Sequence, residues 1–203
     1  MSHIEEEVWG RNKLLIGVDE VAYGNLFGSL FIAGVVFPKG FDFNNIPDLD
    51  DSKKVKDVKR FEIEPLITKN ALWYFCGEVT PAVIDVESAY HAKYRVAKEH
   101  IETCSFPHED ISVLMDGNVI IKGLNVESKC LIKGDSLCKT ISAASILAKC
   151  AQRRQILSLA DDYSEYDIAN NNGYHSKKHR AALIKYGPTP YHRKTYIKKI
   201  CAV

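Results

Sequence analysis

The chain has 203 residues, of which 46% are hydrophobic and 26% are charged, as in an ordinary globular domain. No apolar run reaches the roughly 18 residues that a membrane-spanning helix needs, and the acidic N-terminus lacks the apolar core of a signal peptide. The six cysteines show no CxxC pair and no regular spacing. We therefore expect a cytoplasmic protein with reduced thiols and no membrane association.

The formal net charge of +1 conceals an uneven distribution of charge along the chain. No acidic residue follows Asp167, whereas eight lysines and arginines do, and a second basic run lies within residues 53–60. Each run alone could be the solvated face of a helix. An acid-free tail of this length nevertheless favours a polyanionic partner.

The N-terminal half is predicted to form a meander of β-strands. Residues 13–20 and 29–37 are apolar and rich in β-branched side chains, and turn-forming residues separate them. Residues 71–79 alternate aromatic and smaller side chains and would extend the same sheet. An amphipathic helix is predicted next, because apolar residues recur at helical spacing. Its apolar face would contain Val83, Val86, Tyr90, Ala97 and Ile101.

The C-terminal half alternates strands and helices. Residues 111–116 and 129–133 are short apolar strands of the kind buried in α/β proteins. Residues 142–159, rich in Ala, Ile and Leu, predict a helix in the core. Residues 176–186 predict a helix that begins at a serine N-cap and stops at a Gly-Pro pair. A meander followed by this alternation predicts an α/β fold with a mixed five-stranded sheet flanked by helices.

Four acidic residues stand where predicted strands end: Asp19 and Glu20 after the first, Asp116 at the end of the fourth, and Asp135 after the fifth. Ligand sites collect at strand ends in α/β sheets, and an unpaired carboxylate at the edge of a core is unfavourable. Carboxylates meeting there would repel one another unless cations neutralised them, and oxygen ligands suit Mg²⁺ or Mn²⁺. Two such ions are the usual device for the attack of water on a phosphodiester.

Each carboxylate also has a structural explanation. Asp135 could cap the helix that follows it, and Asp116 could form a turn with the glycine after it. Asp19 and Glu20 could be a solvated strand end. The spacing therefore favours a metal-dependent nuclease without establishing one.

Five ordered motifs resemble those of the ribonuclease HII family, a type-2 ribonuclease H. Gly-Val-Asp-Glu at residues 17–20 is similar to its Gly-x-Asp-Glu opening, and the segment at 49–54 resembles its Leu-x-Asp-Ser-Lys-Lys motif. Leu-Met-Asp-Gly at 114–117 resembles its central Val-Asp-Gly strand. The other two motifs are Lys-Gly-Asp-Ser with the Ser- and Ala-rich run after it, at 133–149, and Gly-Tyr through His-Arg, at 173–193. The similarity covers about residues 14–196.

The resemblance implies a ribonuclease H-like fold in which Asp19, Glu20, Asp116 and Asp135 are catalytic carboxylates that bind two ions, Mg²⁺ or Mn²⁺. The implied substrate is an RNA/DNA hybrid or a DNA duplex containing ribonucleotides, cut to leave 5′-phosphate and 3′-hydroxyl ends. A monomer with a single catalytic domain over residues 1–203 is also expected. Its core would be residues 13–160, followed by a substrate-contacting helical segment at 161–203.

Several substrate contacts are implied as well. Tyr174 resembles the family tyrosine that packs on the ribonucleotide sugar and helps to detect its 2′-hydroxyl, with a half-buried core tyrosine as the alternative. Ser52 and Lys53 resemble phosphate contacts. His192 and Arg193 could also face phosphates, or they could pack inside the protein.

The loop after Glu20 departs from the family pattern, which continues with Ala or Ser, Gly, Arg or Lys, and Gly. This chain has Val21, Ala22, Tyr23 and Gly24 instead, so only the second glycine remains and the cation is missing. A positive φ at Ala22 would cost about 1–2 kcal/mol. The loop either keeps its shape, with Tyr23 and Gly24 contacting substrate and Tyr23 stacking on a sugar or base, or is rebuilt with relaxed junction specificity.

Three functional hypotheses follow. The leading one is an endonuclease that nicks 5′ to ribonucleotides embedded in duplex DNA. The second keeps the same chemistry but acts on runs of RNA in hybrids, and the altered loop separates these two. The third is a non-catalytic nucleic-acid-binding relative, which the four carboxylates disfavour because they repel phosphates.

Overall fold

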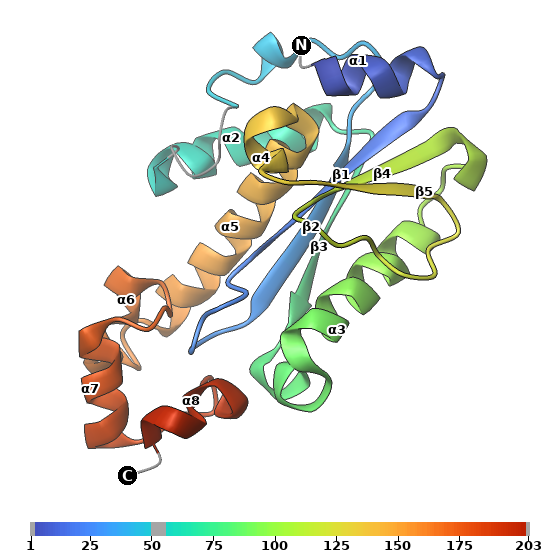
Figure 1. Cartoon of the computed structure of the whole chain (residues 1–203). Helices are drawn as coiled ribbons and strands as arrows, with labels where there is room; N and C mark the ends of the chain where they lie inside the picture. Colours follow the sequence, from blue (N-terminus) through green and yellow to red (C-terminus); the bar gives the residue numbers. More distant parts are fainter. Residues whose placement is uncertain (1–2, 50–55, 202–203) are drawn as a thin grey trace.

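The computed structural model describes residues 3–49 and 56–201, and its strands form one mixed sheet (Figure 1). The five strands are ordered β3-β2-β1-β4-β5. β1 is antiparallel to β2 and parallel to β4, as expected for a meander followed by a crossover. The predicted fold class is therefore confirmed. The strands are β1 (Leu14–Val21), β2 (Leu30–Val36), β3 (Trp73–Val79), β4 (Ile111–Asp116) and β5 (Glu127–Leu131).

β5 lies two residues earlier than the strand predicted at residues 129–133. Its side chains are half-buried or exposed at the edge of the sheet, so apolar content did not mark where it begins. After Leu131 the chain leaves the sheet and enters α4 (Gly134–Leu137). The residue that starts this turn, Lys133, has φ 60°.

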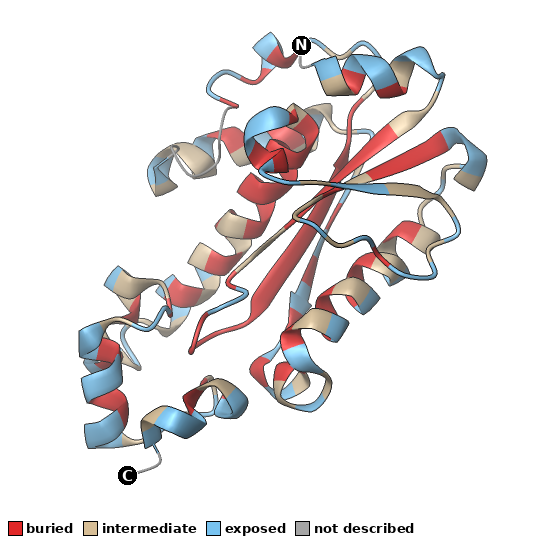
Figure 2. Ribbon diagram, in the orientation of Figure 1, coloured by how far each residue is buried: buried red, intermediate tan, exposed pale blue. Residues whose placement is uncertain are grey.

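Helices cover both faces of the sheet (Figure 1). α5 (Lys139–Leu159) and α2 (Asp57–Asn70) pack on one face, and α3 (Pro81–Glu102) packs on the other. Because alternate residues of a strand point to opposite faces, Ile16 of β1 lies in the cluster on the α3 side, whereas Leu15 packs on the α5 side. Figure 2 shows the core as buried ribbon along β1, β2 and α5.

α5 approaches β1 so closely at Gly17 that no side chain fits between them. A Cβ at Gly17 would lie 2.5 Å from the carbonyl carbon of Thr140. The N-terminus of α5 is bound by Glu5 of α1 (His3–Gly10), a fully buried residue. Its carboxylate accepts hydrogen bonds from the Thr140 amide and hydroxyl at 2.9 and 3.1 Å. This contact is favourable because amides at a helix N-terminus lack partners and carry a partial positive charge.

α3 contains a break at Ser88 that the hydrophobic pattern did not reveal. Ser88 has φ 71° and ψ 151°, outside the helical region, and its hydroxyl accepts a hydrogen bond from the His91 amide at 3.4 Å. Because the break changes the direction of the preceding turn, the prediction that Val86 belongs to the apolar face is wrong. Val86 is 86% exposed, whereas Ala97 and Ile101, after the break, are buried as predicted.

Beyond α5 the chain forms short helices at the end of the sheet where β1 leads into β2 (Figure 1). They are α6 (Ile168–Asn171), α7 (Lys177–Tyr186) and α8 (Lys194–Cys201). Phe27, Tyr166 and Leu183 belong to a separate hydrophobic cluster beneath them, which joins this segment to the β1–β2 connection. Within the described parts of the chain, none of the helices combines the length and the apolarity that crossing a membrane would require.

Candidate nuclease site

Asp19 and Asp116 lie side by side at the ends of adjacent parallel strands. The register of β1 and β4 pairs Val18 with Met115, so the next residues of the two strands are neighbours. Residues in register on parallel strands point to the same face, which here is the face covered by α5. The fold therefore brings together two carboxylates that are almost one hundred residues apart in the sequence.

Asp19 is buried, with 5% of its surface exposed. Loss of hydration raises the pKa of its carboxyl group to about 7, and the negative charges of Glu20 and Asp116 act in the same direction. A hydrogen bond from the Ser145 hydroxyl and the positive charge of Lys149, both on α5, oppose this rise in pKa. The site thus concentrates negative charge that a cation would stabilise.

Asp116 and Asp135 are connected through the turn that begins α4. Asp116 Oδ1 accepts a hydrogen bond from the Gly134 amide at 2.6 Å. A Cβ on Gly134 would lie 2.7 Å from Ile141 Cδ1, so any larger residue here would require the end of the Ile141 side chain to shift. Asp135, the next residue, is 2% exposed. It is not a helix cap, because Lys133 is the N-cap residue of α4 and the N-cap of α5 follows α4.

Glu20 contacts α3, on the other side of the sheet from Asp19. Its Oε1 accepts a hydrogen bond from Lys93 Nζ at 2.6 Å, and the two side chains are 17% and 9% exposed. Across residues 3–49 and 56–201, no three acidic, histidine or cysteine side chains converge into a ready cage for one cation. In this conformation Glu20 is engaged by Lys93 rather than gathered with Asp19 and Asp116.

The loop after Glu20 has the backbone shape that glycine favours, although it contains alanine. Ala22 adopts φ 65°, the left-handed conformation that is unfavourable for a residue with a Cβ. Its carbonyl accepts a hydrogen bond from the Asn25 amide at 3.2 Å, which closes the turn. Tyr23 is 43% exposed, and a Cβ on Gly24 would meet nothing within 4 Å. Both residues are therefore accessible to a ligand.

Backbone hydrogen bonds fix Tyr174 beside this loop. The Gly173 carbonyl accepts hydrogen bonds from the amides of Leu26 and Phe27 at 2.9 and 3.2 Å. Gly173 has φ 81°, and a Cβ on it would lie 2.4 Å from the Phe27 carbonyl oxygen, so the approach again requires glycine. The Tyr174 side chain is 46% exposed and is not part of the core.

His192 and Arg193 are buried, with 1% and 0% of their surfaces exposed, which contradicts the expectation that they contact substrate phosphates. Arg193 Nη1 donates to the Tyr23 carbonyl at 2.9 Å, and Nε donates to the Gly28 carbonyl at 3.0 Å. Burial lowers the pKa of Arg193 to about 10, so the guanidinium stays charged at neutral pH. The packing alternative is therefore correct, and Arg193 holds the Tyr23 loop from inside.

Two neutral histidines support the backbone of Tyr174. His192 Nδ1 accepts a hydrogen bond from the Thr189 amide at 3.0 Å, so its proton resides on Nε2 and is donated to His179 Nε2 at 3.0 Å. His179 Nδ1 in turn donates to the Tyr174 carbonyl at 2.8 Å. Burial lowers the pKa of both imidazoles, that of His192 to about 3. Protonation of either histidine would break this chain of donors and acceptors.

We expect the stability of the protein to fall as the pH drops below about 6.5, the ordinary histidine pKa. A histidine whose pKa is lowered by folding contributes stability above its unfolded-state pKa, and this contribution is lost as the pH falls toward the folded-state value. Each histidine adds up to about 1.4 kcal/mol per pH unit. Urea unfolding between pH 7 and pH 5 should show a smaller pH slope for His192→Gln than for the wild type. Exposed His175→Gln is the control, and equal slopes for wild type and His192→Gln would contradict the expectation.

Ser52 and Lys53, expected as phosphate contacts, lie outside the residues that the structure describes. Two later members of the same basic run pair with acidic neighbours: Lys59 Nζ lies 3.0 Å from Asp48, and Arg60 contacts Asp57. This pairing supports the simpler interpretation of that part of the run as a solvated helix face.

Nothing in the sequence indicated Lys93, and Ser145 and Lys149 were indicated only as members of the motif at residues 133–149. Ser145 and Lys149 carry a detectable signal, because they are polar residues four positions apart in the most apolar part of α5, residues 143–151. Lys93 carries none, because its helix contains other lysines and arginines and only the packing of α3 brings Lys93 to Glu20.

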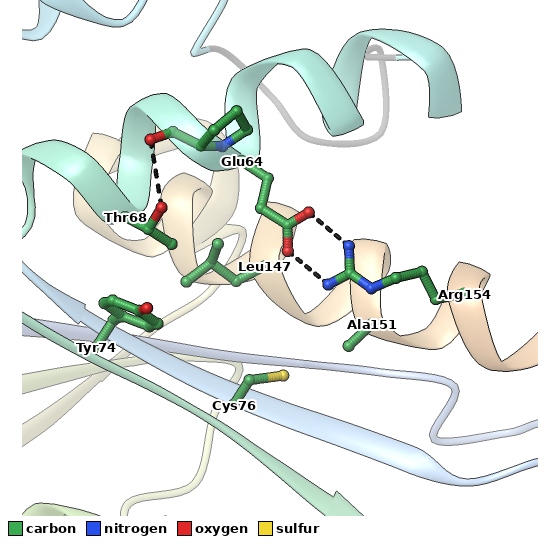
Figure 3. Close-up of a pocket in the computed structure, with 8 residues that line it drawn as sticks. Glu64, Thr68, Tyr74, Cys76, Leu147, Ala151 and Arg154 are labelled. Atoms are coloured by element: carbon green, nitrogen blue, oxygen red, sulfur yellow. Dashed lines mark hydrogen bonds and ion pairs between the residues drawn. The ribbon is translucent and has the colours of Figure 1, made fainter.

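The structure also contains a cavity of about 450 Å³ between α2, α5 and β3, away from the four carboxylates (Figure 3). Glu64 and Arg154 form a two-point ion pair on its wall at 2.6 Å, and Thr68, Tyr74 and Cys76 also line it. Burial raises the pKa of the Cys76 thiol to about 11, so this thiol is protonated at neutral pH. The cavity therefore offers neither a reactive thiolate nor a cluster of carboxylates.

Comparisons with known proteins match the chain to one family and one fold. The family model described as ribonuclease HII matches residues 16–199. A curated ribonuclease HII of Neisseria meningitidis serogroup B is 36% identical over 183 residues, covering 90% of this chain and 92% of the relative. The crystal structure of ribonuclease H2 from Pyrococcus horikoshii superposes with a TM-score of 0.73 at 24% identity, covering 93% of this chain and 97% of that one. Bst-RNase HIII in complex with Mn²⁺ gives a TM-score of 0.64 at 17% identity, covering 94% of this chain and 70% of that one.

Proposed function

Because this chain belongs to the ribonuclease HII family and is therefore an endoribonuclease of the ribonuclease H type, we propose that it nicks duplex DNA on the 5′ side of embedded ribonucleotides. The reaction would be metal-dependent hydrolysis of a phosphodiester, leaving 5′-phosphate and 3′-hydroxyl ends. The substrate would be bound by one catalytic domain that acts as a monomer, with the helical segment at residues 161–203 contributing contacts.

The observation that carries this proposal is the adjacency of Asp19 and Asp116 at the ends of two parallel strands. Two carboxylates held together in a buried site repel each other, and the charge of Asp116 adds to the rise in the pKa of Asp19 that burial mainly causes. Mg²⁺ or Mn²⁺ fits such a donor set, and a Mn²⁺ complex of a ribonuclease HIII with this fold is consistent with that choice. When bound, two ions supply an activated water and neutralise charge on the phosphate. Asp19, Glu20, Asp116 and Asp135 would hold them.

Recognition of the ribonucleotide would depend on Tyr174 and on the loop at Tyr23 and Gly24. Tyr174 is exposed, and backbone hydrogen bonds of Gly173 join its segment to the chain just after the same loop, so the two elements form one surface. The ring of Tyr174 would pack on the ribose, and the exposed backbone at Gly24 would meet the adjacent phosphate. A sugar with a 2′-hydroxyl would be distinguished at this surface.

The second candidate is the same chemistry directed at runs of RNA in hybrids. It is favoured by Tyr23, whose exposed aromatic ring replaces a loop cation that would otherwise attract the phosphate at a single junction. Stacking on a sugar or base is less dependent on that one phosphate. The two candidates differ only in how efficiently the protein cleaves at a lone ribonucleotide relative to a run of RNA.

The test is cleavage of three labelled duplexes in Mg²⁺ and separately in Mn²⁺: one with a single ribonucleotide, a full RNA/DNA hybrid and an all-DNA duplex. Asp116→Asn, prepared in parallel, controls for contaminating nuclease. We expect a nick on the 5′ side of the lone ribonucleotide and no cleavage of all-DNA duplex. Cleavage of the hybrid alone would favour the second candidate, and absence of metal-dependent cleavage of either would leave a binding protein.

A further inference from the structure

Lys93 is a buried cation that pairs with Glu20, one of the four candidate catalytic carboxylates. Only 7% of the residue is exposed, although lysine is almost never buried without a partner. Its partner is Glu20, and the 2.6 Å contact uses Oε1 of that carboxylate. The ammonium thus occupies one side of a carboxylate that, under the proposed function, holds a divalent ion.

The ammonium group also has a second set of contacts, with two aromatic rings. Lys93 Nζ lies 5.0 Å from the centroid of the Tyr23 ring and 4.9 Å from that of Tyr94. Cations are attracted to the faces of such rings, most strongly where water is excluded. The Tyr94 ring is held in place by its hydroxyl, which donates to the Val119 carbonyl at 3.2 Å. An ammonium that leaves Glu20 would therefore retain a favourable position.

Charge decides which cation Glu20 binds. A lysine ammonium and a divalent ion cannot share one carboxylate without strong mutual repulsion, because the repulsion grows with the product of the charges in a site largely shielded from water. Under the proposed function a divalent ion would carry the larger charge and would also interact with Asp19 and Asp116, whereas Lys93 contacts only Glu20 among the four carboxylates.

We propose that Lys93 is an exchangeable counter-cation of Glu20, which pairs with this carboxylate in the metal-free protein and gives it up to a divalent ion. This inference rests on the proposed function. Lys93 would then remain between the rings of Tyr23 and Tyr94. Tyr23 is the exposed loop residue that stands where the family pattern has a cation. Lys93 would restore a positive charge on the side of the site where the loop meets the substrate.

The test is a double-mutant cycle with Lys93→Met, Glu20→Gln and the combined variant, measured by urea unfolding in EDTA and again in Mn²⁺. In EDTA we expect the coupling between the two residues to change the unfolding constant by at least about tenfold. In Mn²⁺ we expect the same coupling factor to lie within about twofold of unity. Calorimetric titration should show that Lys93→Met binds Mn²⁺ roughly tenfold more tightly than the wild type. Lys93→Arg, which keeps the charge, should bind Mn²⁺ more like the wild type.

Lys98→Met is the matched control, because Lys98 lies on the same helix and pairs with Glu102 at 3.6 Å instead. It should change neither the coupling between Lys93 and Glu20 nor the affinity of the protein for Mn²⁺. Weaker Mn²⁺ binding by Lys93→Met would mean that Lys93 orients Glu20 for the ion. It would overturn the proposal that Lys93 gives up Glu20 to the ion. Coupling that persists in Mn²⁺, in a protein that cleaves the lone ribonucleotide, would overturn the inference and leave the proposed function intact. A wild type that neither binds Mn²⁺ nor cleaves would overturn both.

Discussion

Asp116→Asn should reduce cleavage by at least about 10³-fold, equivalent to roughly 4 kcal/mol of transition-state stabilisation, while making the metal-free protein more stable. Under the proposed function Asp116 binds a metal ion, and a neutral amide is a much poorer ligand. In the absence of metal, the negative charge of Asp116 adds to the rise in the pKa of Asp19, of which burial is the largest cause. Asparagine removes this charge and can still accept the Gly134 amide through its Oδ1.

Single-turnover cleavage of the ribonucleotide-containing duplex and thermal unfolding in EDTA are the two measurements. We expect the melting temperature of Asp116→Asn to rise by a few degrees, from a gain of about 1 kcal/mol. Asp110→Asn, an exposed change just before the start of the same strand, should alter neither quantity. Cleavage by Asp116→Asn within tenfold of the wild type would remove Asp116 from the catalytic set. A lower melting temperature would mean that its carboxylate is needed for folding.

Arg193→Met should destabilise the protein by about 3 kcal/mol and lower its melting temperature by roughly 6–12 °C. Methionine can fill much of the space, but it cannot donate to the carbonyls of Tyr23 and Gly28, which Arg193 now binds at 2.9 and 3.0 Å. A carbonyl left without a donor in a buried position costs about 1–3 kcal/mol. Arg193→Lys should recover only part of the loss, because a single ammonium does not reproduce the planar fork of a guanidinium.

The same change should also loosen the Tyr23 loop. We expect the ratio of cleavage at a lone ribonucleotide to cleavage of a full hybrid to fall in Arg193→Met, measured at a temperature where the variant is folded. Arg180→Met provides the comparison, since Arg180 is exposed on α7 and its loss should change stability by no more than about 0.5 kcal/mol. An unchanged ratio, despite lower stability, would show that loop rigidity does not determine junction recognition.

The sequence predicted the sheet well because its strands are short apolar segments bounded by turns. The central strands at Leu14–Val21 and Leu30–Val36 agree with the prediction to within one residue at each end. The edge strand at Glu127–Leu131 was misplaced, since an edge exposes one side and lacks a continuous apolar pattern. The break in α3 was invisible for a related reason: periodicity assumes one unbroken helix, and Ser88 interrupts it by a backbone conformation rather than by proline or glycine.

In the candidate site, too, the sequence indicated some features and missed others. Asp19, Asp116 and Asp135 were identifiable because each lies at or just after the end of a predicted strand, and the parallel register then places the first two side by side. The sequence left open whether the loop at Ala22 keeps its shape or is rebuilt, and the structure has Ala22 in the left-handed conformation. The burial of His192 and Arg193 was not predicted, because a motif shows that two residues belong together without showing whether they face solvent.

By itself, therefore, the sequence determined the α/β class and the family, and it singled out the four candidate carboxylates, all of which depend on local composition and on the order of motifs. Only the tertiary structure decided that Glu5 binds the start of α5, that Lys93 pairs with Glu20, and that Arg193 supports the Tyr23 loop. These three contacts join residues between 73 and 170 positions apart. A charged side chain far away in the chain leaves no periodic signal, and its partner is chosen only when packing removes both groups from water.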